Sequence, residues 1–219
     1  MKIKCLILDH DDTAVDSTAA VHFPAHLEIM KKLRPDYPVI DLNTWFEKNF
    51  EPGVMAYMTD EIGLNSEEME EEYQIWQDFN ETRNPPFYSG LPELLSDYIE
   101  SGGIVAVVSH STENHIRRHY EVGAPGILPK FIFGWDHDPA RRKPSPWPVN
   151  CILEATGLSR DEVLVVDDLK PGVAMAKAAG VPVAAAGWGH SIPSIQIVMK
   201  EICDMWLPDI SSLRAHLFA

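Results

Sequence analysis

The chain has 219 residues, of which 45% are hydrophobic, and it carries a formal net charge of −15 at pH 7. That hydrophobic fraction is ordinary for a globular protein, and the length suits one large domain or a domain with a smaller insert. The negative charge argues against a general affinity for nucleic acids or anionic membranes, and no apolar run is long enough to span a bilayer.

Cysteine usage and the start of the chain bear on the cellular compartment. Cys5, Cys151 and Cys203 are odd in number and irregularly spaced, so they suggest neither a disulfide framework nor a zinc site. No signal peptide precedes the first apolar run. We therefore expect a soluble protein in a reducing, cytoplasmic setting.

The first predicted element is a short buried strand that ends in a group of acids. The apolar run at 5–8 is followed by Asp9, Asp11, Asp12 and Thr13. Such a run is typical of a strand covered on both faces, and ligands bind at the carboxyl ends of parallel strands. Closely spaced carboxylates repel one another unless a cation such as Mg²⁺ lies among them. The alternative is a simple polar turn, because Asp and Thr are common in turns and helix caps.

The next part of the chain, residues 17–88, contains no comparable strand. Amphipathic helical patterns begin near His22, Asn43 and Ser66, separated by proline and glycine. His22 and His26 share one predicted helical face, but nothing nearby completes a metal site, so we expect them to be surface or packing residues. We predict a helical insert at 17–88 and a core formed by residues 1–16 and 89–219.

The remainder alternates short apolar runs with helical signals. Largely apolar runs at 104–109, 163–168 and 181–187, and a shorter one within 131–136, predict strands, and helices are expected after Gly90, after Ser159 and at Pro171. This alternation predicts a parallel sheet with right-handed crossovers. The expected fold is α/β, with a three-layer, Rossmann-like parallel-sheet core and an inserted α-helical cap domain.

Polar side chains follow several of these strands. Asp9 and Asp11, Ser109, and Asp167 with Asp168 should meet at one edge of a parallel sheet. A cation, Lys143, lies in the loop before a helix expected near residue 146. Acids that bind Mg²⁺, together with a lysine and a serine that bind the oxygens of the transferred phosphoryl group, suit phosphoryl transfer. A carboxylate can itself act as the nucleophile in such a reaction.

The same residues resemble the haloacid dehalogenase superfamily, on its phosphatase side. Four motifs match in the family's order and together cover nearly the whole chain: DHDDT from Asp9, the strand end at Ser109, Lys143 with the prolines that follow it, and VVDDLKPGVAMAKAAG from Val165. The pattern of two acids followed by glycine in the last motif resembles phosphoglycolate-phosphatase-like and β-phosphoglucomutase-like members. The insert at 17–88 stands where the family has its helical cap.

The resemblance implies catalytic roles for five residues. Asp9 would be the nucleophile, and Asp11 the acid that protonates the leaving group and then the base that activates water. Thr13 would support the motif and its backbone. Ser109 would bind the transferred phosphoryl group, and Lys143 would offset the charge between the nucleophile and the phosphate.

The resemblance also implies a Mg²⁺ site. Its ligands would be Asp9, Asp168 and the backbone carbonyl of Asp11. Asp167 is either a further ligand or a neighbouring acid that supports the ligands.

Two residues depart from the family pattern. Asp12 stands where glycine is common, but aspartate tolerates unusual backbone angles better than most residues, so we expect the motif to be intact. His110 stands where asparagine is usual. It is a candidate phosphate-binding residue beside Ser109 and Lys143, although the hydrogen bonding there must differ.

The expected function is a Mg²⁺-dependent phosphatase that acts on a small phosphorylated metabolite. A phosphomutase built on the same core is the main alternative. A carbon–chlorine hydrolase is disfavoured because Asp11 and the Asp167–Asp168 pair have no use in that reaction. A non-catalytic binding domain is disfavoured by the complete set of acids, serine and lysine. The identity of the substrate and the oligomeric state are open.

Overall fold

The computed structural model describes residues 2–136 and 138–219, which separate into two compact units. One unit comprises residues 1–16 and 87–219, and the other comprises residues 17–86. The expected boundary at 88/89 lies slightly beyond this division. Phe87 forms an isolated antiparallel bridge with Val15, and the Tyr88 amide donates to the Ala14 carbonyl at 3.1 Å. These contacts attach Phe87 and Tyr88, which follow the helical insert, to the core unit.

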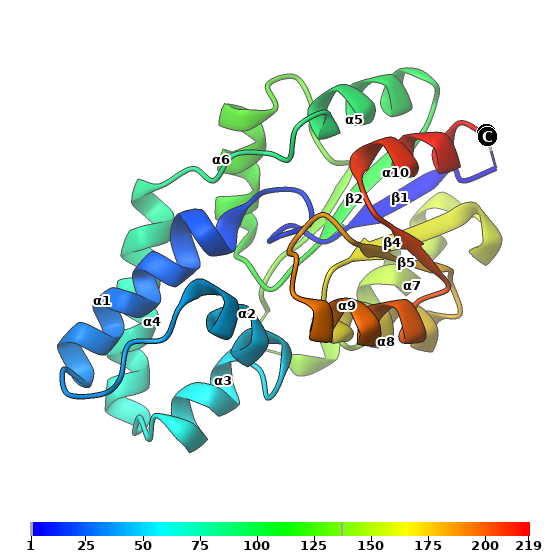
Figure 1. Cartoon of the computed structure of the whole chain (residues 1–219). Coiled ribbons are helices and arrows are strands. Elements are labelled where there is room, and N and C mark those ends of the chain that lie inside the picture. Colours follow the sequence, from blue (N-terminus) through cyan, green and yellow to red (C-terminus); the bar gives the residue numbers. More distant parts are fainter. Residues whose placement is uncertain (1, 137) are drawn as a thin grey trace. The chain divides into compact units, whose positions relative to one another are not determined.

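The core unit is built on a six-stranded sheet in which every pairing is parallel, in the order β3-β2-β1-β4-β5-β6 (Figure 1). The strands are β1 (Cys5–Leu8), β2 (Ile104–Val108), β3 (Phe131–Phe133), β4 (Val163–Asp167), β5 (Val183–Ala186) and β6 (Met205–Leu207). The first strand lies between β2 and β4, with Leu8 opposite Val107 and Val166. The polar ends of these three strands therefore meet at one edge of the sheet. The expected α/β fold with a parallel sheet is confirmed.

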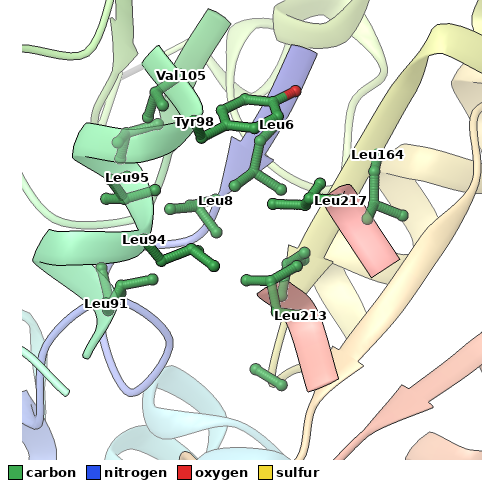
Figure 2. Close-up of a cluster of buried hydrophobic side chains, with 14 of the residues drawn as sticks. Leu6, Leu8, Leu91, Leu94, Leu95, Tyr98, Val105, Leu164, Leu213 and Leu217 are labelled. Carbon is green, nitrogen blue, oxygen red and sulfur yellow. The ribbon is translucent and has the colours of Figure 1, made fainter. Parts of the chain in front are cut away.

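Helices cover both faces of this sheet. The core helices are α5 (Leu91–Glu100), α6 (Glu113–Gly123), α7 (Trp147–Thr156), α8 (Lys170–Ala179), α9 (Pro193–Ile202) and α10 (Ile210–Leu217). Figure 2 shows Leu94 of α5 and Leu213 of α10 converging on strand residues that include Leu6 and Leu8. Helices α7, α8 and α9 lie on the opposite side of the sheet in Figure 1. Strands buried on both faces explain their continuous apolar sequences.

Two short turns of 3₁₀ helix complete the core unit, at Pro139–Arg141 and Arg160–Glu162. The second follows the capping-box sequence that led us to expect a longer helix after Ser159. The capping box forms, but the helix ends after one turn because Val163 begins strand β4. Runs of β-branched residues favour strands, and here they override the capping signal.

All regular secondary structure among the described residues of the second unit is helical. It contains a π-helical turn (Thr18–His22), α1 (Phe23–Leu33), α2 (Leu42–Phe50), α3 (Val54–Ala56), a second π-helical turn (Tyr57–Glu61) and α4 (Ser66–Thr82). Asn65 caps α4 through a complete capping box with Glu68. The core of this unit contains Ile29, Trp45 and Met58. No described helix of the chain is both long and apolar enough to cross a membrane.

Candidate active site

The buried ammonium group of Lys143 contacts two acids at the carboxyl ends of the neighbouring strands β1 and β4. Its Nζ lies 2.7 Å from Asp9 Oδ1 and 2.8 Å from Asp167 Oδ2, and all three side chains are almost fully buried. Burial lowers the pKa of Lys143, but the charges of Asp167 and Asp9 outweigh this effect and hold the pKa above its ordinary value. The lysine is therefore a fixed positive charge beside the candidate nucleophile.

Three buried carboxylates form a cluster that could bind a metal ion. One oxygen each from Asp9, Asp167 and Asp168 lies within 4.8 Å of the others. Burial raises the pKa of Asp167 to about 7, with Lys143 opposing that rise. Burial and the charges of the neighbouring acids raise the pKa of Asp168 well above its ordinary value. Because an all-oxygen set of mutually repelling acids is stabilised by a hard cation, these residues fit a divalent metal such as Mg²⁺.

Local geometry in the turn after β4 sets the positions of these acids. The Leu169 amide donates to Asp167 Oδ1 at 2.9 Å, and the Thr13 hydroxyl donates to Asp168 Oδ1 at 3.2 Å. A Cβ atom at Gly172 would lie 1.8 Å from the Asp167 carboxylate, so only glycine leaves room for that side chain. The predicted motif at 165–180 thus includes a glycine that the acid itself requires.

The carboxylate of Asp11 contacts a different group of residues. Its Oδ2 accepts hydrogen bonds from the Ser109 hydroxyl at 3.2 Å and from the Ser111 hydroxyl at 2.7 Å. The Ser111 amide in turn donates to Ser109 Oγ at 3.0 Å. Among the described residues, the cluster that could bind a metal does not include the Asp11 carboxylate. The backbone carbonyl of Asp11 is therefore the atom left for the metal-ligand role that the resemblance implies. The two acids of the first motif therefore have separate surroundings.

Ser111 is a site residue that the sequence analysis missed. Its side chain is buried, and its hydroxyl makes the shorter of the two hydrogen bonds to Asp11. The available signal was a second serine two positions after Ser109, in a turn that leads into α6. Loop residues carry no periodicity, so spacing alone did not separate this serine from an ordinary turn residue.

The structure places His110 against the backbone of the lysine loop. Its Nε2 lies 3.0 Å from the Lys143 carbonyl oxygen, and because a carbonyl only accepts, Nε2 must be the protonated ring nitrogen. Desolvation, followed by the charge of Lys143, lowers the pKa of His110. His110 therefore holds the loop that carries Lys143 through this hydrogen bond, and its contact with phosphate stays a prediction.

A buried histidine pair lies next to the first motif and was also missed. Nε2 of His10 lies 2.9 Å from Nδ1 of His119 on α6, and the two rings stack with centroids 5.2 Å apart. Burial, followed by the charge of His10, lowers the pKa of His119 to about 3. This buried pair connects the turn after β1 with α6.

Asp12 adopts a left-handed backbone conformation, with φ of 54°. This is the conformation for which the family commonly uses glycine, and aspartate is among the few other residues that enter it readily. The loop at 187–189 supports the turn. The Trp188 Nε1 atom donates to the Thr13 carbonyl at 2.9 Å, and a Cβ atom at Gly189 would lie 2.1 Å from the Asp12 carbonyl oxygen.

The chain is similar in sequence to proteins of one known family. Residues 6–186 match the family model for haloacid dehalogenase-like hydrolases. Phosphoglycolate phosphatase of Rhodospirillum rubrum is 46% identical, but only over 52 residues, which are 24% of this chain and 22% of that protein. Phosphoglycolate phosphatase of Pseudomonas savastanoi pv. phaseolicola is 23% identical over 86% of this chain and 71% of its own length.

Solved structures agree on the fold. A haloacid dehalogenase-like family hydrolase of Streptococcus pneumoniae superposes with a TM-score of 0.78 at 17% identity, over 98% of each chain. The relatives also agree with the phosphoglycolate-phosphatase-like branch that the motifs resembled. The chain belongs to the haloacid dehalogenase-like hydrolase family.

Proposed function

We propose that this protein is a Mg²⁺-dependent phosphatase that hydrolyses a small-molecule phosphate monoester through a phosphorylated Asp9. The observation that carries the proposal is the separation of two acids within one turn. Asp9 contacts Lys143, whereas Asp11 accepts hydrogen bonds from Ser109 and Ser111. Hydrolysis of an ester needs one carboxylate as nucleophile and a second that moves a proton, and this arrangement supplies both.

In the first step, a carboxylate oxygen of Asp9 attacks phosphorus, and the bond from phosphorus to the ester oxygen breaks. Asp11 donates a proton to the departing oxygen. With substrate bound, the Ser109 hydroxyl would turn from Asp11 to donate its hydrogen to a phosphoryl oxygen, while Ser111 stays on Asp11, and Lys143 offsets the negative charge shared by Asp9 and the phosphoryl group. The buried position of Lys143 strengthens that interaction, because screening by water is weak there.

In the second step, Asp11 accepts a proton from water, which attacks phosphorus and releases inorganic phosphate from Asp9. Asp9, Asp168 and the Asp11 carbonyl would hold the metal, with Asp167 as a further candidate, and bound Mg²⁺ would neutralise charge on the phosphoryl oxygens. Thr13, through its hydrogen bond to Asp168, positions one of these ligands.

The names of the curated relatives support a small phosphorylated substrate, and they make phosphoglycolate the first compound to assay. We further propose that the helical unit is a substrate-selecting cap. Three cysteines that form no disulfide support a reducing, cytoplasmic setting.

The test is phosphate release from 4-nitrophenyl phosphate in the presence of Mg²⁺. Asp9→Asn should abolish turnover, because the amide is a poor nucleophile. Asp161→Asn, the same chemical change at an exposed position, should retain full activity. Activity in the Asp9 variant comparable to that of the wild type would refute the proposal.

A further inference from the structure

Arg142 immediately precedes the buried lysine and has an unusual environment for a cation in this acidic chain. Its guanidinium carbon lies 3.7 Å from the centroid of the Trp135 ring, and its Nη1 donates to the Asp136 carbonyl at 2.6 Å. Within the part of the chain that the structure describes, Arg142 forms no ion pair. Its neighbour Arg141 differs, because it lies 3.7 Å from the Asp138 carboxylate.

The contacts of Trp135 place this arginine beside the phosphoryl-binding turn. The Trp135 amide donates to the Ser111 carbonyl at 2.9 Å, and its ring meets His110 edge-on with centroids 5.9 Å apart. His110 directly follows Ser109, which is the candidate phosphate ligand. The charge of Arg142 also contributes to lowering the pKa of His110. Arg142, Trp135 and His110 thus form a row of contacting side chains that starts next to Ser109.

The two cationic side chains of this loop, Lys143 and Arg142, differ in how many of their hydrogen-bond donors are already used. Lys143 is buried and already contacts both Asp9 and Asp167. Arg142 is only partly buried, and no described residue forms a hydrogen bond with its Nε or Nη2 donors. A guanidinium already held over an indole ring loses little entropy on binding, and its planar donors match the two oxygens of a carboxylate or phosphate.

We propose that Arg142 binds a second anionic group of the substrate, so that the preferred substrate is a phosphate monoester that also carries a carboxylate or a second phosphate. This inference rests on the proposed phosphatase function. Lys143 and the serine hydroxyl then serve the phosphate that reacts, while Arg142 selects esters by the charge on the remainder of the molecule. Trp135 is a positioning residue that holds the guanidinium in place.

The experiment compares substrates that share a two-carbon skeleton: phosphoglycolate, ethyl phosphate and ethylene glycol bisphosphate. Phosphoglycolate and ethylene glycol bisphosphate carry a second anionic group and are called the anionic esters, whereas ethyl phosphate carries only the phosphate that reacts. The wild type should show a higher kcat/KM for at least one anionic ester than for ethyl phosphate. Arg142→Ala should lower the ratio of these two values by about 10- to 100-fold, since hydrogen bonds to charged groups are worth about 1.5 to 3 kcal/mol. Arg142→Lys should lower the ratio less, because the charge remains and the planar donors are lost. The two anionic esters show whether a carboxylate or a phosphate is preferred.

Arg141→Ala removes the same charge from the same loop and should leave the ratio unchanged. Because each ratio is measured within one protein sample, partial misfolding of a variant cancels. A ratio that stays within about twofold of the wild type in Arg142→Ala overturns the inference, as does a wild type without preference for either anionic ester. If no ester releases phosphate, including 4-nitrophenyl phosphate, the proposed function itself fails. Hydrolysis of ethyl phosphate and 4-nitrophenyl phosphate alone, which carry no second anionic group, would refute only the role of Arg142.

Discussion

Replacing Lys143 with methionine removes the ammonium group that contacts both Asp9 and Asp167. The two carboxylates remain buried without their cation. Removing one partner of a buried ion pair costs about 3 to 5 kcal/mol, because the remaining charge has lost both water and its partner. For a chain of this size each kcal/mol shifts the melting temperature by about 2 to 4 °C, so we expect a fall of about 6 to 20 °C.

The destabilisation should depend on pH in a defined direction. Burial already raises the pKa of Asp167 to about 7, and Lys143 opposes that rise, so its loss raises the pKa further. A carboxyl group whose pKa in the folded state exceeds its unfolded value of 3.8 is harder to ionise in the folded protein, so it destabilises the fold at high pH. This destabilisation shrinks as the pH falls towards 3.8, because the group is then protonated in the folded protein. The gap between variant and wild type should therefore be largest near pH 8 and narrower near pH 5.5.

The assay is thermal unfolding followed by circular dichroism, in metal-free buffer at both pH values. Lys177→Met, at an exposed position on α8, should stay within about 0.5 kcal/mol of the wild type. Adding Asp9→Asn to the Lys143 variant should restore part of the lost stability, since one unpaired charge is removed. A Lys143 variant within about 1 kcal/mol of the wild type at pH 8, or a gap that widens in acid, would refute the electrostatic argument.

Three further predictions use other parts of the structure. Ser111→Ala should lower kcat/KM for ethyl phosphate about tenfold more than for 4-nitrophenyl phosphate, because only the poor leaving group needs the proton that Asp11 delivers. Mg²⁺ at 100 times its dissociation constant should stabilise the protein by about 2.7 kcal/mol, raising the melting temperature by about 5 to 10 °C, and Asp168→Asn should lose most of that shift. Burial lowers the pKa of His26 to about 4, so acid protonates this side chain more readily in the unfolded chain than in the folded one. The free energy of unfolding, measured by thermal unfolding, should therefore fall by up to about 3 kcal/mol between pH 6.5 and pH 4. His26→Phe should flatten this pH dependence.

Each of these predictions has a matched control and a contradicting result. An equal loss on both esters in the Ser111 variant would indicate general damage to the site. Asp161→Asn should keep the full response to Mg²⁺, and a full response in the Asp168 variant would remove that acid from the metal site. His216→Gln, in the last helix, should keep the wild-type pH dependence, and a His26 variant with an equally steep loss in acid would assign the effect to other groups.

The buried strands and their polar ends could be predicted because both follow from local pattern. Runs such as 5–8 and 163–166 are apolar throughout, and the parallel sheet then brings Asp9, Ser109 and Asp167 to one edge. Strand β6 was not predicted, since a strand of three residues at the edge of the sheet, two of them partly exposed, carries too little pattern. The role of Ser111 was not predicted because it depends on a side chain about 100 residues away in the sequence.

The first motif depends on more of the chain than its own sequence indicates. The left-handed turn at Asp12 is supported by the loop at 187–189, where Trp188 donates to Thr13 and Tyr88 donates to the Gly189 carbonyl at 3.2 Å. Any side chain at position 189 would collide with the Asp12 carbonyl, so a glycine far along the chain permits this turn.

Aspartate in place of glycine at position 12 also adds a buried charge to the site. That charge contributes to raising the pKa of Asp168, after burial itself and the charge of Asp9. Glycine would satisfy the left-handed backbone without this electrostatic cost, so Asp12 increases the repulsion that a bound cation relieves. The departure from the family pattern therefore leaves the left-handed turn intact and adds to the repulsion that a cation bound among Asp9, Asp167 and Asp168 would relieve.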